Sequence, residues 1–307
     1  MTRSRGLLIV AVIVLCAIAP FLVRDRFLYH LGILICIQAI LALSVNLMLK
    51  LGQLSLAQAG FMGIGAYTSA LLSRDLGVAV LAALPIAVVA SAVVAAVLGS
   101  IILRVRGIYF VLLTFTLGET IRLIFVQCVV PFGGNNGLPS IPAIAAFGIS
   151  LQERSATYGV ALAAVLASLG LSHLLFLGDH GRILRGIARN EPLMQSLGVD
   201  STAYRRLAFT VSAAIAGLAG GLYAHYVGFI SPAAFNVTAS VGAVVLNVVG
   251  GSAFLLGPVV GAVLLVPLPE LFRGAVAYQS LFYGLSLLAL TLFLPRGALG
   301  LLGGRVG

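Results

Sequence analysis

Few side chains in this sequence could perform chemistry. The 307 residues include 8 acidic residues, 4 histidines and 3 cysteines. The acids inside apolar segments are Glu119 and Glu270, and no GxSxG, HExxH or GxGD motif is present. A membrane enzyme would need a nucleophile with a base, or a pair of acids, so the sequence predicts no catalytic residue.

Nucleotide and metal binding are also disfavoured. A P-loop requires the lysine of GxxxxGK[ST], and the single lysine is Lys50 in LMLKLGQ. His225 has no second metal-binding residue spaced with it, so we expect a packed or interfacial histidine and no metal site. The three cysteines, Cys16, Cys36 and Cys128, lie in apolar runs and are interpreted as small hydrophobic residues in packed helices. We expect no cofactor in this chain.

Polar residues inside apolar segments form a second group of candidates. Gln53, Ser55 and Gln58 precede small residues at 60–66 that permit close helix packing, and Asn247 lies beside two glycines. These side chains could join helices by hydrogen bonds. They could instead line the translocation pathway of a polar solute, because water makes polar groups tolerable within a membrane.

Glu119 and Arg122 are opposite charges three residues apart, deep in an apolar run. A helix places such residues on one face. An unpaired charge at the bilayer centre costs about 2.5–3.5 kcal/mol on insertion scales, so we expect an intramembrane ion pair with a structural role.

The stretch GRILRGIARNEPLMQSLGVDSTAYRR, residues 181–206, contains five of the eighteen basic residues. Pro192 and Gly198 bracket a short helix predicted at 192–197, since proline favours a helix start and glycine a left-handed stop. Its Leu193, Met194 and Leu197 should form an apolar face. This helix could rest on lipid or could dock into a groove of a soluble protein.

Membrane-spanning helices must position all these residues. The composition is 61% hydrophobic and 8% charged, with a mean hydropathy of +1.17, and apolar runs fill most of the chain. The runs are continuous, which excludes a β-barrel and predicts an all-α polytopic membrane protein. We count ten runs, listed as 6–23, 29–49, 54–72, 77–103, 107–131, 156–178, 207–229, 237–250, 256–272 and 278–295.

The runs at 237–250 and 256–272 are short for a bilayer, which leaves eight crossings plus a re-entrant pair as the alternative. The run at 6–23 resembles a secretory signal, but Pro20 follows the small residues, so we interpret it as the first helix. Ten crossings place twelve basic residues on one side and five on the other, which predicts that both termini are cytoplasmic. The net charge of +10 therefore reflects basic loops at a lipid bilayer and does not indicate nucleic-acid binding.

Several stretches resemble the permease subunits of ATP-binding-cassette importers for branched-chain amino acids, in particular their LivM-like branch. They are AILALSVNLMLKLGQLSLAQAGFMGIGAYTSALL (39–72), RGIYFVLLTFTLGETIRLIF (106–125), GGNNGL (133–138), the 181–206 stretch, LAFTVSAAIAGLAGGLYAHYVGFISPAAF (207–235), GGSAFLLGPVVGA (250–262) and LFLPRG (292–297). They occur in the family's order and cover nearly the whole chain.

The resemblance implies a single permease domain over residues 1–307, with the ABC importer permease fold. It implies that 181–206 is a cytoplasmic coupling loop. The residues that would contact an ATPase are Ala188, Arg189, Asn190, Glu191, Pro192, Leu193, Met194, Leu197 and Gly198.

The family's partners would be two cytoplasmic ATPase subunits, which would bind the ATP, a second LivH-like permease subunit and a periplasmic substrate-binding protein. The location would be the bacterial inner membrane. Alternating access would carry leucine, isoleucine or valine inward, whereas related permeases carry urea, amides or other neutral amino acids. A secondary transporter is the rival class, but the sequence has no cation-binding or proton-relay cluster.

Overall fold

The computed structural model of the chain describes residues 25–146, 149–150, 154–176, 178–271, 284, 288 and 297–302. The α-helices are α2 (Arg26–Lys50), α3 (Gln58–Asp75), α4 (Val80–Ile102), α5 (Ile108–Gln127), α6 (Val129–Phe132), α7 (Arg154–Phe176), α8 (Gly178–Arg189), α9 (Glu191–Ser196), α10 (Ser201–Val227), α11 (Val237–Gly250), α12 (Gly257–Leu265), α13 (Pro267–Leu271) and α15 (Ala298–Leu302). The remaining elements are 3-10 helices η1 (Gly134–Asn136) and η2 (Pro232–Phe235), and strands β1 (Ala145–Ala146) and β2 (Ile149–Ser150).

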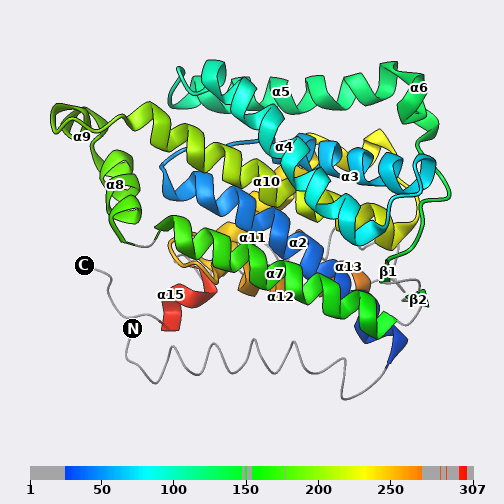
Figure 1. The fold of residues 1–307 in the computed structure, drawn as a ribbon. Coiled ribbons are helices and arrows are strands. Elements are labelled where there is room, and N and C mark those ends of the chain that lie inside the picture. Colours follow the sequence, from blue (N-terminus) through cyan, green and yellow to red (C-terminus); the bar gives the residue numbers. More distant parts are fainter. Residues whose placement is uncertain are drawn as a thin grey trace.

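The long helices lie side by side in a bundle, with α2 and α10 at its centre and α5 along one edge (Figure 1). The most apolar part of α2 is 78% buried and that of α10 is 72% buried, against 33%, 28% and 33% for α4, α5 and α7. The outer helices therefore expose broad apolar faces. This pattern is expected for a bundle whose surroundings are lipid or a partner subunit.

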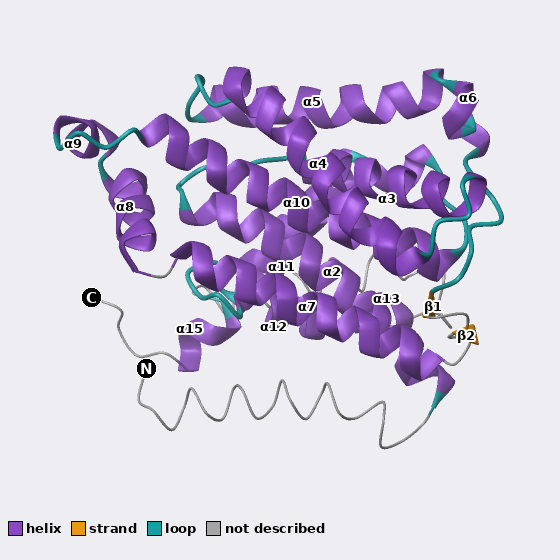
Figure 2. Cartoon of the chain, viewed as in Figure 1, coloured by secondary structure: helices purple, strands orange, loops and turns teal. Residues whose placement is uncertain are grey.

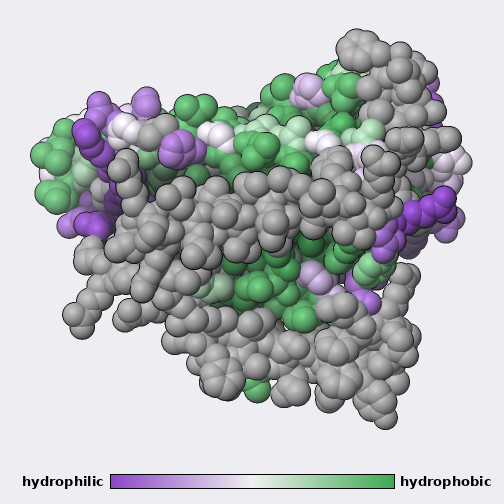
Figure 3. Space-filling model, turned by 90° about the horizontal axis from the view of Figure 1, so that it is seen from below, coloured by the Kyte–Doolittle hydropathy of each residue, from purple (hydrophilic) through white to green (hydrophobic). Residues whose placement is uncertain are grey.

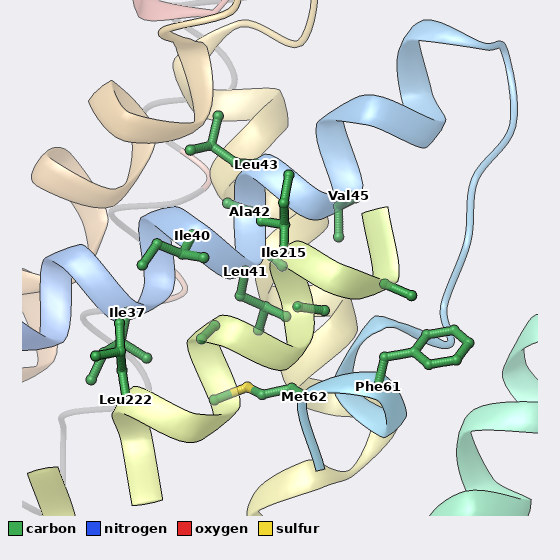
Figure 4. Packing of buried hydrophobic residues seen from close by; sticks show 14 of the residues in the cluster. Ile37, Ile40, Leu41, Ala42, Leu43, Val45, Phe61, Met62, Ile215 and Leu222 are labelled. Atoms are coloured by element: carbon green, nitrogen blue, oxygen red, sulfur yellow. The ribbon is translucent and has the colours of Figure 1, made fainter. Parts of the chain in front are cut away.

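The centre of the bundle is packed by aliphatic side chains of α2, α3 and α10, including Ile37, Leu41, Met62 and Ile215 (Figure 4). Small residues let these helices approach closely. A Cβ atom on Gly65 of α3 would lie 2.1 Å from the carbonyl oxygen of Gly217 of α10. The prediction that small residues after Gln58 allow close helix packing is therefore confirmed.

Two ends of the bundle carry the polar connections. At one end, α8 and α9 project beyond α7 and α10, and α6 with the two short strands lies at the opposite end (Figures 1 and 2). The strands pair antiparallel over two residues each. Among the coloured residues of the face in Figure 3, those in the middle are mostly hydrophobic and the hydrophilic ones gather toward the two ends, as in a membrane-spanning bundle.

Basic residues are unequally divided between these ends. Among the described residues, the end that carries α8 and α9 has Lys50, Arg104, Arg106, Arg182, Arg185, Arg189, Arg205 and Arg206, and the opposite end has Arg26, Arg74 and Arg154. The predicted charge asymmetry is thus retained in three dimensions.

Five described helices are long and apolar enough to cross a membrane: Arg26–Lys50, Val80–Ile102, Ile108–Gln127, Ser155–Phe176 and Ser201–Val227. The runs at 237–250 and 256–272 form the shorter α11 and the pair α12 and α13, and α11 packs against α12. The predicted first and tenth runs, at 6–23 and 278–295, lie outside the described helices, so ten crossings stay a prediction. The helical, polytopic membrane architecture is confirmed.

Cysteine positions correct one expectation. Cys36 is buried in α2 as predicted, but Cys128 is exposed, because the helix ends there and Cys128 is the C-cap of α5. Cys16 lies outside the described residues.

Candidate functional site

The predicted coupling loop begins with α8, which is strongly amphipathic. Gly181, Leu184 and Ile187 face the protein and are buried. Arg182, Arg185 and Arg189 are exposed, as their spacing predicts. The helix therefore packs by an apolar stripe and turns its guanidinium groups outward.

The short helix α9 is held by a cap at each end. Asn190 precedes it with φ −153° and ψ 88°, and its side chain accepts a hydrogen bond from the backbone N–H of Leu193 at 3.2 Å. Gly198 follows with φ +81°, the left-handed conformation that the sequence predicted. The predicted range 192–197 lies one residue too far along the chain at each end, because Asn190 is the N-cap and Leu197 the C-cap.

The apolar residues of α9 and its C-cap, Leu197, do not share one face. Leu193 and Leu197 are 54% and 69% exposed, so they are available to a partner. Met194 instead packs on α8, and a Cβ atom on Gly186 would lie 2.6 Å from its sulfur. The predicted three-residue apolar face is therefore an exposed leucine pair, with Met194 attaching α9 to α8.

Glu191, the first residue of α9, is the centre of a polar network. Its Oε1 accepts hydrogen bonds from Nη2 of Arg106 at 3.1 Å, from Oγ of Ser201 at 2.7 Å and from Nη1 of Arg205 at 3.4 Å. Gln195 of α9 adds a bond from Nε2 to Oγ of Ser201 at 2.8 Å. One carboxylate therefore connects α9 to α10 and to the α4–α5 connection.

Arg205 extends the network into the bundle. Its side chain is 4% exposed, and Nη2 donates to the carbonyl oxygen of Val105 at 3.5 Å. With its amide oxygen turned toward the guanidinium, Gln53 accepts a bond from Nε of Arg205 at 3.3 Å. Gln53, a candidate pathway residue, thus lies in this network at the end of the bundle that carries α8 and α9.

The sequence indicated no role for Arg205 beyond that of a basic loop residue. Glu191 and Arg205 are fourteen residues apart, and Val105 and Gln53 come from distant loops. Helical spacing links residues three or four apart only. The only indication in the sequence was the high density of arginines in residues 181–206, which suggests that one of them needs a carboxylate partner.

The other predicted pathway residues are buried between helices. Gln58 donates from Nε2 to Oγ of Ser212 at 2.9 Å, which joins α3 to α10. Asn247 donates to the carbonyl oxygens of Ala42 and Ala243, both at 2.8 Å. These contacts favour the interpretation that the amides join helices.

Two polar atoms in this group have no hydrogen-bond partner among the described residues: Oγ of Ser55 and Oε1 of Gln58. Both side chains are fully buried. An internal water or a polar solute could satisfy them, so a pathway role for these two residues stays a prediction.

Glu119 and Arg122 form the predicted ion pair. Nε of Arg122 donates to Oε2 of Glu119 at 2.7 Å, and the side chains are 26% and 27% exposed. The pair lies on α5, whose exposed residues include Leu112, Phe115, Leu123 and Ile124. It therefore borders an apolar face of an outer helix.

His225 is buried in the interior, which agrees with the first of the two predictions, a packed rather than an interfacial histidine. Its Nδ1 donates to the carbonyl oxygen of Pro142 at 2.7 Å, and its Nε2 lies 2.7 Å from Oγ of Ser69. Within the described residues, no three His, Cys, Asp or Glu side chains gather into a possible metal site.

Comparisons with known proteins identify the family to which the chain is similar. The branched-chain amino acid transport system / permease component family matches residues 28–294. The high-affinity branched-chain amino acid transport system permease protein LivM of Escherichia coli (strain K12) is 32% identical over 97% of this chain and 76% of its own length. The protein of the same name from Salmonella typhimurium (strain LT2) has the same identity and coverage. No solved structure matches the chain.

Proposed function

The chain belongs to the branched-chain amino acid transport system permease family, and we propose that it is the membrane-spanning subunit of an ATP-binding-cassette importer for leucine, isoleucine and valine. The resemblance found in the sequence motifs is thereby confirmed. Its relatives are permease proteins, so its role is transport and not catalysis.

The observation that carries the ATP-driven mechanism is the exposed leucine pair on α9. Leu193 and Leu197 are exposed, and α9 lies at the end of the bundle that holds most of the described basic residues (Figure 1). Apolar side chains in that position suit a hydrophobic groove on a peripheral protein. We propose that this groove belongs to a cytoplasmic ATPase subunit, with Ala188, Arg189 and Asn190 at its edge.

The remaining partners follow from the proposed cycle. Two ATPase subunits would drive alternating access, a periplasmic binding protein would deliver the amino acid, and a second LivH-like permease subunit would complete the pathway. The end that carries α8 and α9 would face the cytoplasm, because basic residues accumulate on that side of a membrane. The membrane would be the bacterial inner membrane.

We place the second permease subunit against the exposed face of α5. Glu119 and Arg122 border that face, and charged groups within a membrane-spanning helix normally face protein or water rather than lipid. The neighbouring apolar side chains Leu112 and Phe115 supply contact area. The ion pair would then be enclosed when the two permease subunits assemble.

Substrate class is tested with the complete transporter, expressed in cells that lack their own branched-chain amino acid uptake. Uptake of radiolabelled leucine should be inhibited by excess isoleucine and valine, and should stop when the ATPase subunits are omitted. Inhibition by urea or a short amide alone would favour those related substrates. Uptake that continues without the ATPases would instead indicate a secondary transporter.

Docking is tested with Leu197→Asp. A carboxylate in a desolvated contact costs several kcal/mol, so about 2 kcal/mol or more of interface stability should be lost. Co-purification of the ATPases with the permease should fall sharply, while the amount of permease in the membrane is unchanged. Ser196→Asp adds the same charge to the same helix and is the matched control. Retention of the ATPases in Leu197→Asp would contradict the docking assignment.

A further inference from the structure

Glu191 and Arg205 attach α9 to the bundle more extensively than docking by Leu193 and Leu197 requires. We propose that this ion pair is the positioning element that makes α9 move together with α10 and the α4–α5 and α2–α3 connections. The pair would thereby transmit ATPase movement to the membrane helices. This proposal rests on the docking of an ATPase on α9 proposed above.

The backbone alone would not hold α9 in one orientation. Asn190 on one side has an extended conformation, and Gly198 on the other has a left-handed one. The Gly198 turn is closed by backbone hydrogen bonds from Gly198 to Gln195 at 3.0 Å and from Val199 to Met194 at 3.1 Å, which lie within α9 and its own C-terminal turn. A Cβ atom on Gly198 would meet nothing within 4 Å, so no other element packs against the turn at this position. A six-residue helix between two such joints can pivot when it is pushed, unless side chains fix it.

Side chains on α9 make the attachment in two places. Met194 packs on Gly186 of α8, which is a contact between adjacent elements. Glu191 and Gln195 both reach Ser201, at the first residue of α10, with distances of 2.7 and 2.8 Å. The polar contacts therefore bridge the Gly198 turn and connect α9 directly to a membrane-spanning helix.

The network then divides to reach two further connections of the bundle. Arg106, on the α4–α5 connection, donates to Glu191 at 3.1 Å. Arg205 contacts both the carbonyl of Val105 on that connection and the amide of Gln53 on the α2–α3 connection. A displacement of α9 would thus be communicated to α2, α3, α4, α5 and α10 at one end of the bundle.

Burial makes the central pair stiff. The side chain of Arg205 is 4% exposed and that of Glu191 is 13% exposed, so little water can replace either partner. Separation of the pair would leave a buried guanidinium without its carboxylate, which is strongly unfavourable. One arrangement is therefore favoured, and α9 and the start of α10 should move as a unit.

The test uses the complete transporter, reconstituted in proteoliposomes with its binding protein and supplied with radiolabelled leucine. In Glu191→Gln, the ATPase subunits should still co-purify, because Leu193 and Leu197 are unchanged. Uptake should fall by roughly tenfold, the factor expected when a hydrogen bond to a charged group is lost. ATP hydrolysis should fall less, so the ATP consumed per leucine transported should rise several-fold.

Arg182→Gln is the matched control, because it removes an arginine from an exposed ion pair with Asp179 within α8, the helix before α9. Its ATP-to-leucine ratio should equal that of the wild type. Arg205→Lys keeps the positive charge and should restore part of the coupling that Arg205→Gln loses. If Glu191→Gln reduces the amount of assembled transporter, Ser201→Ala and Arg106→Gln test the same network without stranding the buried guanidinium.

An unchanged ATP-to-leucine ratio in Glu191→Gln, or in both substitute variants, would overturn the positioning role. Loss of the ATPases from Glu191→Gln would overturn it as well, since the residue would then belong to the docking surface. Failure of the docking proposal itself is recognised separately, by ATPases that remain bound to Leu197→Asp.

Discussion

Asn46 of α2 donates a hydrogen bond from Nδ2 to Oδ1 of Asn247 of α11, and the two atoms are 2.9 Å apart in the buried interior. Asn46 also donates to the carbonyl oxygen of Ser252, in the connection after α11. Asn247 in turn donates to the carbonyl of Ala42 in α2. This reciprocal arrangement joins a central membrane helix to the short helix beside the glycine pair.

Substitution of Asn247 by leucine should destabilise the permease. The change removes one of the two acceptors of the Asn46 amide and leaves it only the carbonyl of Ser252. Interhelical hydrogen bonds in membranes contribute about 0.6–1.7 kcal/mol each. The thermal midpoint of the detergent-purified protein, followed by size-exclusion chromatography after heating, should decrease.

The matched control for this pair is the double variant Asn46→Leu with Asn247→Leu. It should lose less stability than the sum of the two single changes, because each single change already breaks the shared bond. Additive losses would show that the two amides act independently. Normal stability with abolished leucine uptake in Asn247→Leu would instead indicate that this side chain lines the pathway.

Gly198→Val should weaken the attachment of the ATPases. The position has φ +81°, which a β-branched residue adopts poorly, although the surrounding space is open. The effect must therefore act through the backbone and alter the orientation of α9. Gly198→Asn is the control, since asparagine tolerates the left-handed region and should retain most ATPase co-purification. Equal behaviour of the two variants would exclude backbone strain as the cause.

Glu119→Gln should lower the amount of assembled transporter. In the native pair, Nε of Arg122 lies 2.7 Å from Oε2 of Glu119. The change leaves the partly buried guanidinium of Arg122 without this carboxylate, which is unfavourable within a membrane. The double change Glu119→Gln with Arg122→Met should restore part of the yield, because neither charge then remains. The yields are compared by quantitative immunoblot of the purified complex. Normal assembly with abolished uptake in the single variant would place Glu119 in the translocation pathway.

Reporter fusions should place the two ends of the bundle on opposite sides of the membrane. A reporter in the 181–206 loop and one after Arg305 should report the cytoplasm, and one in the 133–138 loop should report the outside. In the structure, α8 and α9 lie at one end of the bundle, and α6 and the adjoining η1 lie at the other (Figure 1). A cytoplasmic signal from the 133–138 loop would overturn the predicted topology from residue 107 onward.

Local patterns in the sequence were sufficient to predict several features of the structure. Continuous apolar runs determined a helical membrane protein, since a span must satisfy its own backbone hydrogen bonds. The three-residue separation of Glu119 and Arg122 predicted their ion pair, because one helical turn brings them together. Gly198 marked the end of α9 by its conformational freedom.

The tertiary structure alone decided which polar residues meet. Asn46 and Asn247 are 201 residues apart in the chain, and nothing in their spacing connects them. The sequence left open whether Gln53 joins helices or lines a pathway, and the structure places it against Arg205. Met194 was expected on a partner but packs on α8. Secondary structure fixes which residues share a face of a helix. What that face contacts is decided by the packing of several helices, because the burial of each side chain depends on the positions of all the neighbouring helices.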